Sequence, residues 1–280
     1  MIVDFHTHTF PEKIAAAAIA KMQMDCHSAA FTAGTEAALR MSMQAAGIDL
    51  AVVLPVATNP LKLKSINDAS LRANGQGGLI CFGCVHPDAP DWDAEMRRIA
   101  QGGLQGVKIH PVYQGVDIDD PRYIRILSLA GELGLTVVMH AGNDIGFPGV
   151  VRCSPEMTLR ALRQTGPIRL VMAHMGGWRN WDEAAMLAGT GVYIDTAFSL
   201  GAITPLDDGH YAPEELPLLV DDAFVRLVRL FGAERVLFGT DSPWTDQAAE
   251  LAHVRALPLT NHELAAILGR NAAAILGLDR

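Results

Sequence analysis

The sequence is poor in charged residues and has no long uninterrupted hydrophobic run. Charged side chains make up 19% of its 280 residues, which is too few for a disordered chain or a coiled coil. No apolar stretch is long enough to span a bilayer, and no basic segment followed by an apolar one marks a signal peptide. We therefore expect a cytoplasmic protein without a membrane partner.

Positive charge is also scarce. The chain has 22 Lys and Arg against 31 Asp and Glu, and a formal net charge of -9 argues against binding to nucleic acids or anionic membranes. Its four cysteines fit a reducing compartment. Cys81 and Cys84 form a CxxC within an apolar run, where buried thiols are expected rather than a redox or zinc pair. Hydrophobic residues are abundant at 50%, enough for one large domain over residues 1–280.

Eight short apolar runs recur along the chain and predict β-strands. Most are continuously apolar, as expected of parallel strands buried on both faces. Helix signals lie between them, with Asp120, Ser154 and Thr260 as predicted N-caps. The alternation predicts an α/β protein with a single (β/α)8 TIM barrel. A doubly wound open sheet is the alternative, but DFHTHTFPEK after the first run is not a glycine-rich phosphate loop. The runs cover residues 2–5, 50–55, 79–85, 104–109, 135–140, 168–174, 191–196 and 235–241.

Two connections are longer than the others. They cover residues 11–34 and 197–219, and the second contains two glycines and three prolines before its final leucines. Long connections on a barrel often serve as lids or substrate walls, so we expect these two segments to set specificity.

Polar side chains follow several of the predicted strands. The carboxyl ends of barrel strands open onto one face, so these side chains are expected to converge. His6 and His8 are two residues apart and share one face of a strand. With nitrogen from His140 and oxygen from Asp241 they would form a donor set that suits zinc, and also manganese, iron or cobalt. His174 would then act as a general base or electrostatic aid beside an activated water. One strand-end histidine is ordinarily structural, but several at converging ends favour a site.

Five further residues are candidates for substrate binding, and each has a plainer alternative. Lys108 shares a strand face with His110 and could contact substrate, bridge two metals when carboxylated, or form a structural ion pair. His110 could line the pocket or merely end its strand. Arg152 could hold a carboxylate, although a solvated or ion-paired arginine is commoner. Trp178 and Trp244 could wall the pocket or simply pack at strand ends.

Six motifs together resemble the amidohydrolase superfamily. They are DFHTH, GVKIHP, VVMHAG, LVMAHMGG, FGTDSPW and ILGRNAAAILGL, which cover nearly the whole chain in this order. More narrowly, the chain is similar to the amidohydrolase-related (amidohydrolase 2) branch that includes aminocarboxymuconate-semialdehyde and γ-resorcylate decarboxylases.

The resemblance implies a distorted TIM barrel with one divalent metal, most often zinc, and a homodimer is common in the branch. It implies His6, His8, His140 and Asp241 as ligands, and His174 and Asp241 as proton-moving groups. Superfamily members with two metals use a carboxylated lysine and the sixth-strand histidine, which keeps Lys108 and His174 open as ligands. We favour one metal, with zinc first and manganese second.

Three functions remain open on this basis. The first is a hydrolase that attacks an ester, lactone or amide carbon of a small molecule. The second is a non-oxidative decarboxylase of an aromatic or dienoic acid, which a pair of arginines aimed at the metal would favour. Arg152 and Arg179 are the candidates for that pair. The third is a binding barrel with a structural metal, which a closed and fully protein-ligated site would favour.

Overall fold

The computed structural model describes residues 1–278, and it confirms that the chain is an α/β protein with parallel strands. Each of the eight apolar runs contains a strand, and the third contains two, separated at Phe82. The strands are β1 (Val3–Thr7), β2 (Leu50–Val53), β3 (Leu79–Cys81), β4 (Gly83–Cys84), β5 (Gly106–Ile109), β6 (Thr136–Met139), β7 (Arg169–Met172), β8 (Tyr193–Asp195) and β9 (Val236–Leu237).

The predicted N-caps are confirmed. The side chains of Asp120, Ser154 and Thr260 accept N–H groups from the first turns of α6, α7 and α11. Within residues 1–278, none of the helices is long and apolar enough to cross a membrane. The α-helices are α1 (Glu12–Cys26), α2 (Glu36–Ala46), α3 (Leu63–Ala73), α4 (Trp92–Gln101), α5 (Pro111–Gln114), α6 (Pro121–Glu132), α7 (Pro155–Leu162), α8 (Trp181–Ala184), α9 (Asp221–Phe231), α10 (Gln247–Ala256), α11 (Asn261–Ala265) and α12 (Asn271–Leu276).

The chain divides into two compact units. Unit 1 consists of residues 1–51 together with residue 196 to the end of the described chain, and unit 2 consists of residues 52–195. The single domain expected over residues 1–280 therefore stays a prediction, and its last two residues lie outside those described.

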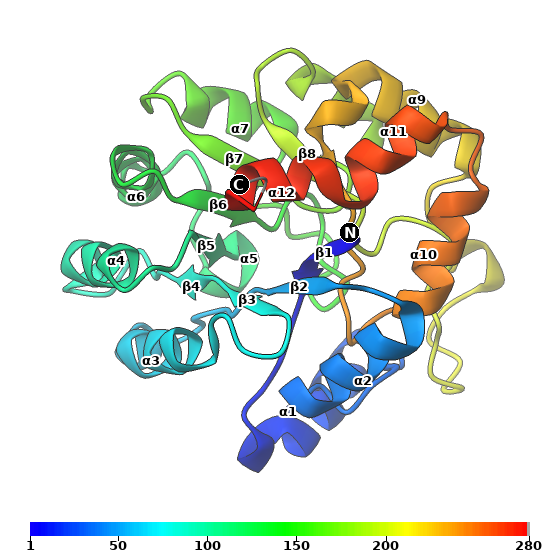
Figure 1. Ribbon diagram of the computed structural model, residues 1–280, viewed down its shortest axis with the longest axis horizontal. Helices are drawn as coiled ribbons and strands as arrows, with labels where there is room; N and C mark the ends of the chain where they lie inside the picture. Colours follow the sequence, from blue (N-terminus) through cyan, green and yellow to red (C-terminus); the bar gives the residue numbers. More distant parts are fainter. Residues whose placement is uncertain (279–280) are drawn as a thin grey trace. The chain divides into compact units, whose positions relative to one another are not determined.

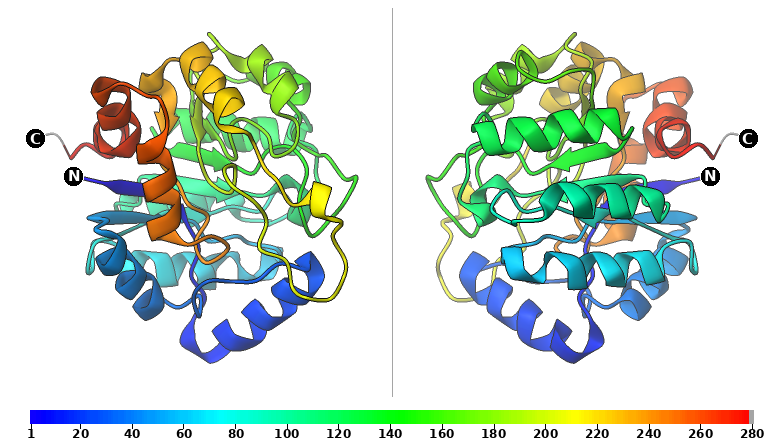
Figure 2. Two further views of the ribbon diagram at one scale, coloured as in Figure 1. Left: turned by 90° about the vertical axis from the view of Figure 1, so that its right-hand side faces the viewer. Right: turned by 90° about the vertical axis from the view of Figure 1, so that its left-hand side faces the viewer.

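Unit 2 is a parallel sheet with helices along one side. Strands β4 to β7 pair in sequence order, and β7 pairs with β8. Helices α3, α4, α6 and α7 lie in a row along these strands (Figures 1 and 2). Val107, Val137 and Val171 are fully buried, as expected of strands covered on both faces. This pairing brings the carboxyl ends of β5, β6 and β7 side by side, where His110, His140 and His174 follow.

Unit 1 brings the two ends of the sequence together. The N–H of Phe5 in β1 donates to the carbonyl of Phe238, just after β9, over 2.7 Å. The N–H of Leu50 in β2 donates to Ile2 over 3.2 Å. Helices α2 and α10 pack against each other, although they lie far apart in the sequence (Figure 1). Strands β1 and β9, which precede several of the predicted site residues, therefore come from opposite ends of the chain.

The two long connections differ in structure, and only the second is mainly a loop. Residues 11–34 contain the 15-residue helix α1, so the first is largely helical. The second, 197–219, contains only one short helical turn, Pro213–Glu215. The segments contact each other within unit 1, where the Tyr211 hydroxyl donates to the carbonyl of Cys26 over 2.6 Å. A role in specificity stays a prediction.

Candidate metal centre

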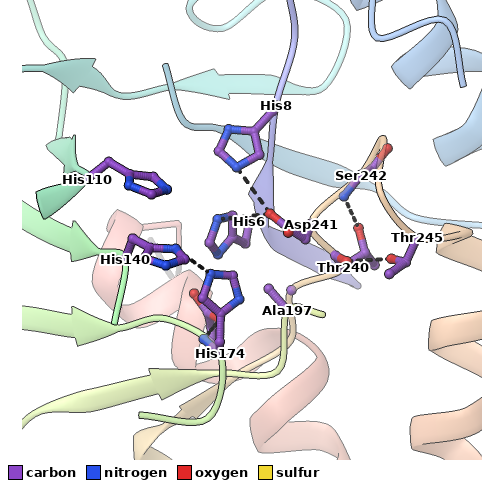
Figure 3. Close-up of polar contacts among 12 residues, drawn as sticks. His6, His8, His110, His140, His174, Ala197, Thr240, Asp241, Ser242 and Thr245 are labelled. Atoms are coloured by element: carbon purple, nitrogen blue, oxygen red, sulfur yellow. Dashed lines mark hydrogen bonds and ion pairs between the residues drawn. The ribbon is translucent and has the colours of Figure 1, made fainter. Parts of the chain in front are cut away.

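Three of the predicted metal ligands lie together within unit 1. His6 belongs to β1, His8 follows directly after it, and Asp241 lies in the segment after β9. The N–H of Asp241 donates to the carbonyl of His6 over 2.8 Å, and the N–H of His8 donates to that of Ser242 over 2.7 Å. These bonds hold the two segments parallel and bring the three side chains to one end of the strands (Figure 3).

The three donor atoms fit the ligand spacing of a metal ion. Oδ1 of Asp241 lies 3.3 Å from Nε2 of His6 and 3.1 Å from Nε2 of His8. Two tetrahedral ligands bound at ordinary zinc distances lie roughly 3.3 Å apart. The His6 side chain is fully buried, whereas His8 keeps 16% of its side-chain surface. We call His6, His8 and Asp241 the ligand cluster; its donor set suits zinc and also manganese.

A buried acid next to the ligand cluster, Asp4, braces it, and no sequence pattern predicted this role. Asp4 accepts hydrogen bonds from the hydroxyl of Thr240 over 2.6 Å and from the Gln247 amide over 2.7 Å. It also accepts the backbone N–H of His6 over 3.2 Å. Burial raises the pKa of Asp4 to about 6 in spite of these bonds. Asp4 therefore ties the segment holding His6 to the one holding Asp241.

A second buried acid lies on α10. Glu250 is 9% exposed, and burial, followed by the negative charges of Asp4, Asp246 and Asp241, raises its pKa to about 8. The charged form is therefore costly beside the ligand cluster, and a cation there would lower that cost.

The fourth predicted ligand, His140, and the predicted catalytic residue His174 lie together within unit 2. His140 and His174 follow neighbouring strands, and Nδ1 of His140 lies 3.1 Å from Nε2 of His174 (Figure 3). The backbone N–H of His174 donates to Oδ1 of Asp195 over 2.9 Å, and its carbonyl accepts from Nε1 of Trp181 over 3.0 Å. His174 has a left-handed backbone at φ 59°, as does Asp241 of unit 1 at φ 68°. Such strain in non-glycine residues is concentrated at functional sites.

His110 completes this group, together with Asp144, an acid that the sequence did not predict. The rings of His110 and His140 are stacked with centroids 4.0 Å apart and planes inclined by 11°. Oδ2 of Asp144 lies 3.4 Å from Nε2 of His110 and 3.5 Å from Nε2 of His140. We call His110, His140, His174 and Asp144 the imidazole cluster. The only signal for Asp144 was its position four residues after His140, which in a loop fixes no direction.

A family comparison covers nearly all of the chain. The amidohydrolase family model matches residues 3–278. The chain belongs to the amidohydrolase family. This membership confirms the resemblance read from the six motifs, and with the donor set of the ligand cluster it supports a metal-dependent enzyme. A search of curated proteins found no match.

Solved structures show the fold of this amidohydrolase. An uncharacterised TIM-barrel protein from Bordetella bronchiseptica has a TM-score of 0.76 at 19% identity, covering 99% of this chain and 98% of its own. A dihydroxybenzoic acid decarboxylase from Polaromonas, solved with manganese and an inhibitor, has 0.69 at 12%, covering 100% and 97%. A candidate 2-pyrone-4,6-dicarboxylic acid hydrolase from Pseudomonas putida has 0.66 at 18%, covering 100% and 98%. The predicted TIM-barrel fold class is confirmed.

The predicted substrate-binding residues of this amidohydrolase have different surroundings. Lys108 is 1% exposed in the middle of the unit 2 sheet, opposite Cys84 and Val138. Nη1 of Arg152 donates to Asp117 over 2.8 Å in a partly exposed ion pair. An ion pair is the commoner role of an arginine, as noted above for Arg152. A contact between Arg152 and the substrate stays a prediction.

The two tryptophans are held by backbone contacts beside the candidate residues. Trp178 is 7% exposed, and its N–H donates to the carbonyl of Ala141, directly after His140, over 2.8 Å. The N–H of Trp244 donates to the carbonyl of Asp241 over 2.9 Å. Each tryptophan is therefore fixed next to a predicted site residue of its own unit, and a role as a pocket wall stays a prediction.

Proposed function

We propose that this amidohydrolase is a metal-dependent hydrolase of a small molecule with an ester, lactone or amide carbon. The observation that carries the proposal is the ligand cluster, in which one carboxylate oxygen lies within 3.3 Å of two imidazole nitrogens. We propose one divalent metal, zinc first and manganese second, held by His6, His8 and Asp241 with His140 as the fourth ligand predicted from the sequence. A divalent metal bound there supplies a Lewis acid for a carbonyl oxygen and lowers the pKa of water.

The chain's own groups then orient substrate and move protons. We propose His174 as the general base, because it follows β7 beside His140 and its main chain is held by hydrogen bonds with Asp195 and Trp181. His174 and Asp241 would take up the proton that the attacking water loses and pass it to the leaving group. Lys108, His110 and Trp178 are proposed to line the substrate side of unit 2, and Trp244 that of unit 1.

Decarboxylation of an aromatic or dienoic acid is the second candidate, favoured by the several decarboxylases among the similar structures. Its expected signature was a pair of arginines directed at the metal. Arg152 instead forms an ion pair with Asp117, and the guanidinium of Arg179 lies over the ring of Trp178, 5.0 Å from its centroid. We therefore rank hydrolysis first. A purely structural metal ranks last, because the His8 and Asp241 side chains keep 16% and 12% of their surface exposed.

Metal content is the first test. Protein purified without added metal or affinity tag would be measured by ICP-MS, and about one zinc or manganese per chain is expected. Close to two would add Lys108 and His174 to the ligands and favour a binuclear hydrolase. No metal after reconstitution would refute the proposal.

Product analysis then separates the two reactions. The loaded enzyme would be screened against lactones and esters with proton release as the readout, and against aromatic carboxylic acids with carbon dioxide release as the readout. The His6→Ala/His8→Ala variant is the control for adventitious hydrolysis. Carbon dioxide release that requires the ligand cluster would reverse our ranking.

A further inference from the structure

Asp144 is a buried carboxylate that the proposed reaction does not use. It lies in the loop between β6 and α7 and is 5% exposed. Its Oδ1 accepts the N–H of Gly146 over 2.8 Å, which fixes the carboxylate within its own turn. Its Oδ2 lies 3.5 Å from Nε2 of His140 and 3.4 Å from Nε2 of His110.

The neighbours of His140 specify where its proton lies. Nε2 is 3.0 Å from the carbonyl oxygen of Asn143, and a carbonyl oxygen can only accept a hydrogen bond. The proton of a neutral His140 therefore belongs on Nε2. The lone pair is then on Nδ1, the nitrogen that lies 3.1 Å from Nε2 of His174.

The carboxylate of Asp144 favours the same position of the His140 proton as the carbonyl of Asn143 does. A buried negative charge is stabilised by N–H groups that point toward it, so Oδ2 favours a proton on the nitrogen facing it. Histidines that bind metals commonly donate their other ring N–H to a carboxylate or a carbonyl, which fixes both ring orientation and tautomer. His140 has both kinds of acceptor beside Nε2.

We propose that Asp144 is a positioning residue that holds the proton of His140 on Nε2 and keeps Nδ1 available as the donor atom. The part of this inference that concerns metal binding rests on the proposed function. The inferred tautomer of His140 does not rest on the proposed function, because the contacts from which it is inferred lie within unit 2.

A second metal held by His110, His140 and Asp144 is the competing interpretation. Their donor atoms lie within 4.8 Å of one another. However, the two rings are nearly parallel at 11°, so their in-plane lone pairs do not converge on one point. The carbonyl of Asn143 also requires a proton on the nitrogen that a metal would occupy. The contacts favour positioning over a second ion.

The experiment reads the tautomer directly. Long-range proton–nitrogen NMR spectra of the full-length chain with ¹⁵N-labelled histidine, recorded first without metal and then with zinc, distinguish Nε2–H from Nδ1–H, and His140→Gln assigns the signal. The test variant is Asp144→Asn, which keeps the shape and the acceptor for Gly146 but removes the charge. The matched control is Asp117→Asn, which removes a loop carboxylate whose ion pair is with Arg152. Zinc affinity is measured by competition with a chelator on the unsubstituted chain, on Asp144→Asn and on Asp117→Asn.

In the metal-free, unsubstituted chain we expect the proton of His140 on Nε2. In metal-free Asp144→Asn we expect a shift toward Nδ1–H, and on titration with zinc a loss of affinity of roughly 10- to 100-fold, with neither change in Asp117→Asn. A proton on Nδ1, or a metal on Nε2, in the unsubstituted chain overturns the proposal without any variant. An unchanged tautomer and an unchanged zinc affinity in Asp144→Asn also overturn it. If the unsubstituted chain binds two zinc ions and Asp144→Asn loses one of them, Asp144 is a metal ligand and the proposal is overturned as well. A chain that binds no zinc refutes the proposed function, while the same spectra still decide the tautomer.

Discussion

The ligand cluster of unit 1 and the imidazole cluster of unit 2 both follow the carboxyl ends of parallel strands, but their polar groups are satisfied differently. In the ligand cluster, one carboxylate faces the Nε2 atoms of His6 and His8 above the buried acid Asp4. In the imidazole cluster, Asn143, Asp144 and Asp195 accept or face the N–H groups of the histidines and their main chain. The first arrangement suits a cation, and the second suits rings held in a fixed tautomer.

The largest expected effect is the loss of metal from unit 1. His6→Ala/His8→Ala removes two proposed ligands, and the loss of affinity should exceed the roughly 10- to 100-fold cost of removing a partner of a ligand. ICP-MS and chelator competition measure the change. His253→Ala/His262→Ala, which removes two histidines of α10 and α11, should keep the metal. Full metal occupancy in the first variant would contradict the ligand assignment.

The imidazole cluster should respond to substitution with lost activity rather than lost metal. His174→Ala removes the proposed general base and should lower kcat by roughly 10²- to 10⁴-fold while metal content is unchanged. Steady-state rates on a substrate found by the screen, together with ICP-MS, test both parts. If the metal is lost as well, His174 is a ligand and a two-metal site is favoured.

Gly142, three residues after β6, tests how closely the backbone of unit 2 is packed. Gly142 has φ +83°, and an added Cβ would collide with the backbone of Trp178. Gly142→Ala should therefore destabilise the protein by about 2–4 kcal/mol, measured by denaturant unfolding. Gly134→Ala is the control, because Gly134 has φ +68° but open space around its Cβ position. Equal losses in the two variants would mean that the contact with Trp178 adds nothing.

The smallest expected effect concerns the acids of unit 1. The pKa of Glu250 is about 8 when folded, against an ordinary 4.5. The folded chain binds the additional proton between these values, so the free energy of unfolding falls as pH rises from about 4.5 to 8. Glu250→Gln removes that loss and should stabilise the metal-free protein at pH 8.5 but not at pH 4.5. We expect about 2 kcal/mol, roughly half of what the full shift corresponds to, because the folded chain relaxes around a buried charge.

The comparison for this prediction is Glu132→Gln, which changes an exposed carboxylate of unit 2 and should leave the stability at both pH values nearly unchanged. A stability gain for Glu250→Gln that is the same at pH 4.5 and pH 8.5 would show that packing, rather than charge, is responsible.

Much of the fold was readable because it depends on neighbours in the sequence. The eight apolar runs located the strands, and Asp120, Ser154 and Thr260 located helix starts, because a cap bonds to an N–H only two or three residues away. The α1 helix within residues 11–34 was missed, because its apolar residues are spread around the helix and half of them are alanines, with only Ala15, Ile19 and Cys26 buried.

The candidate site likewise has features that the local sequence predicts and features that only the folded chain shows. The sequence by itself determined which histidines follow strands and that His6 and His8 share a face, because side chains alternate along a strand. Only the tertiary structure decided that Asp4 braces Thr240 across 236 positions, that Arg152 pairs with Asp117, and that Asp144 faces two stacked imidazoles. Such contacts depend on where buried charges find partners once distant segments have packed, and no local periodicity encodes that choice.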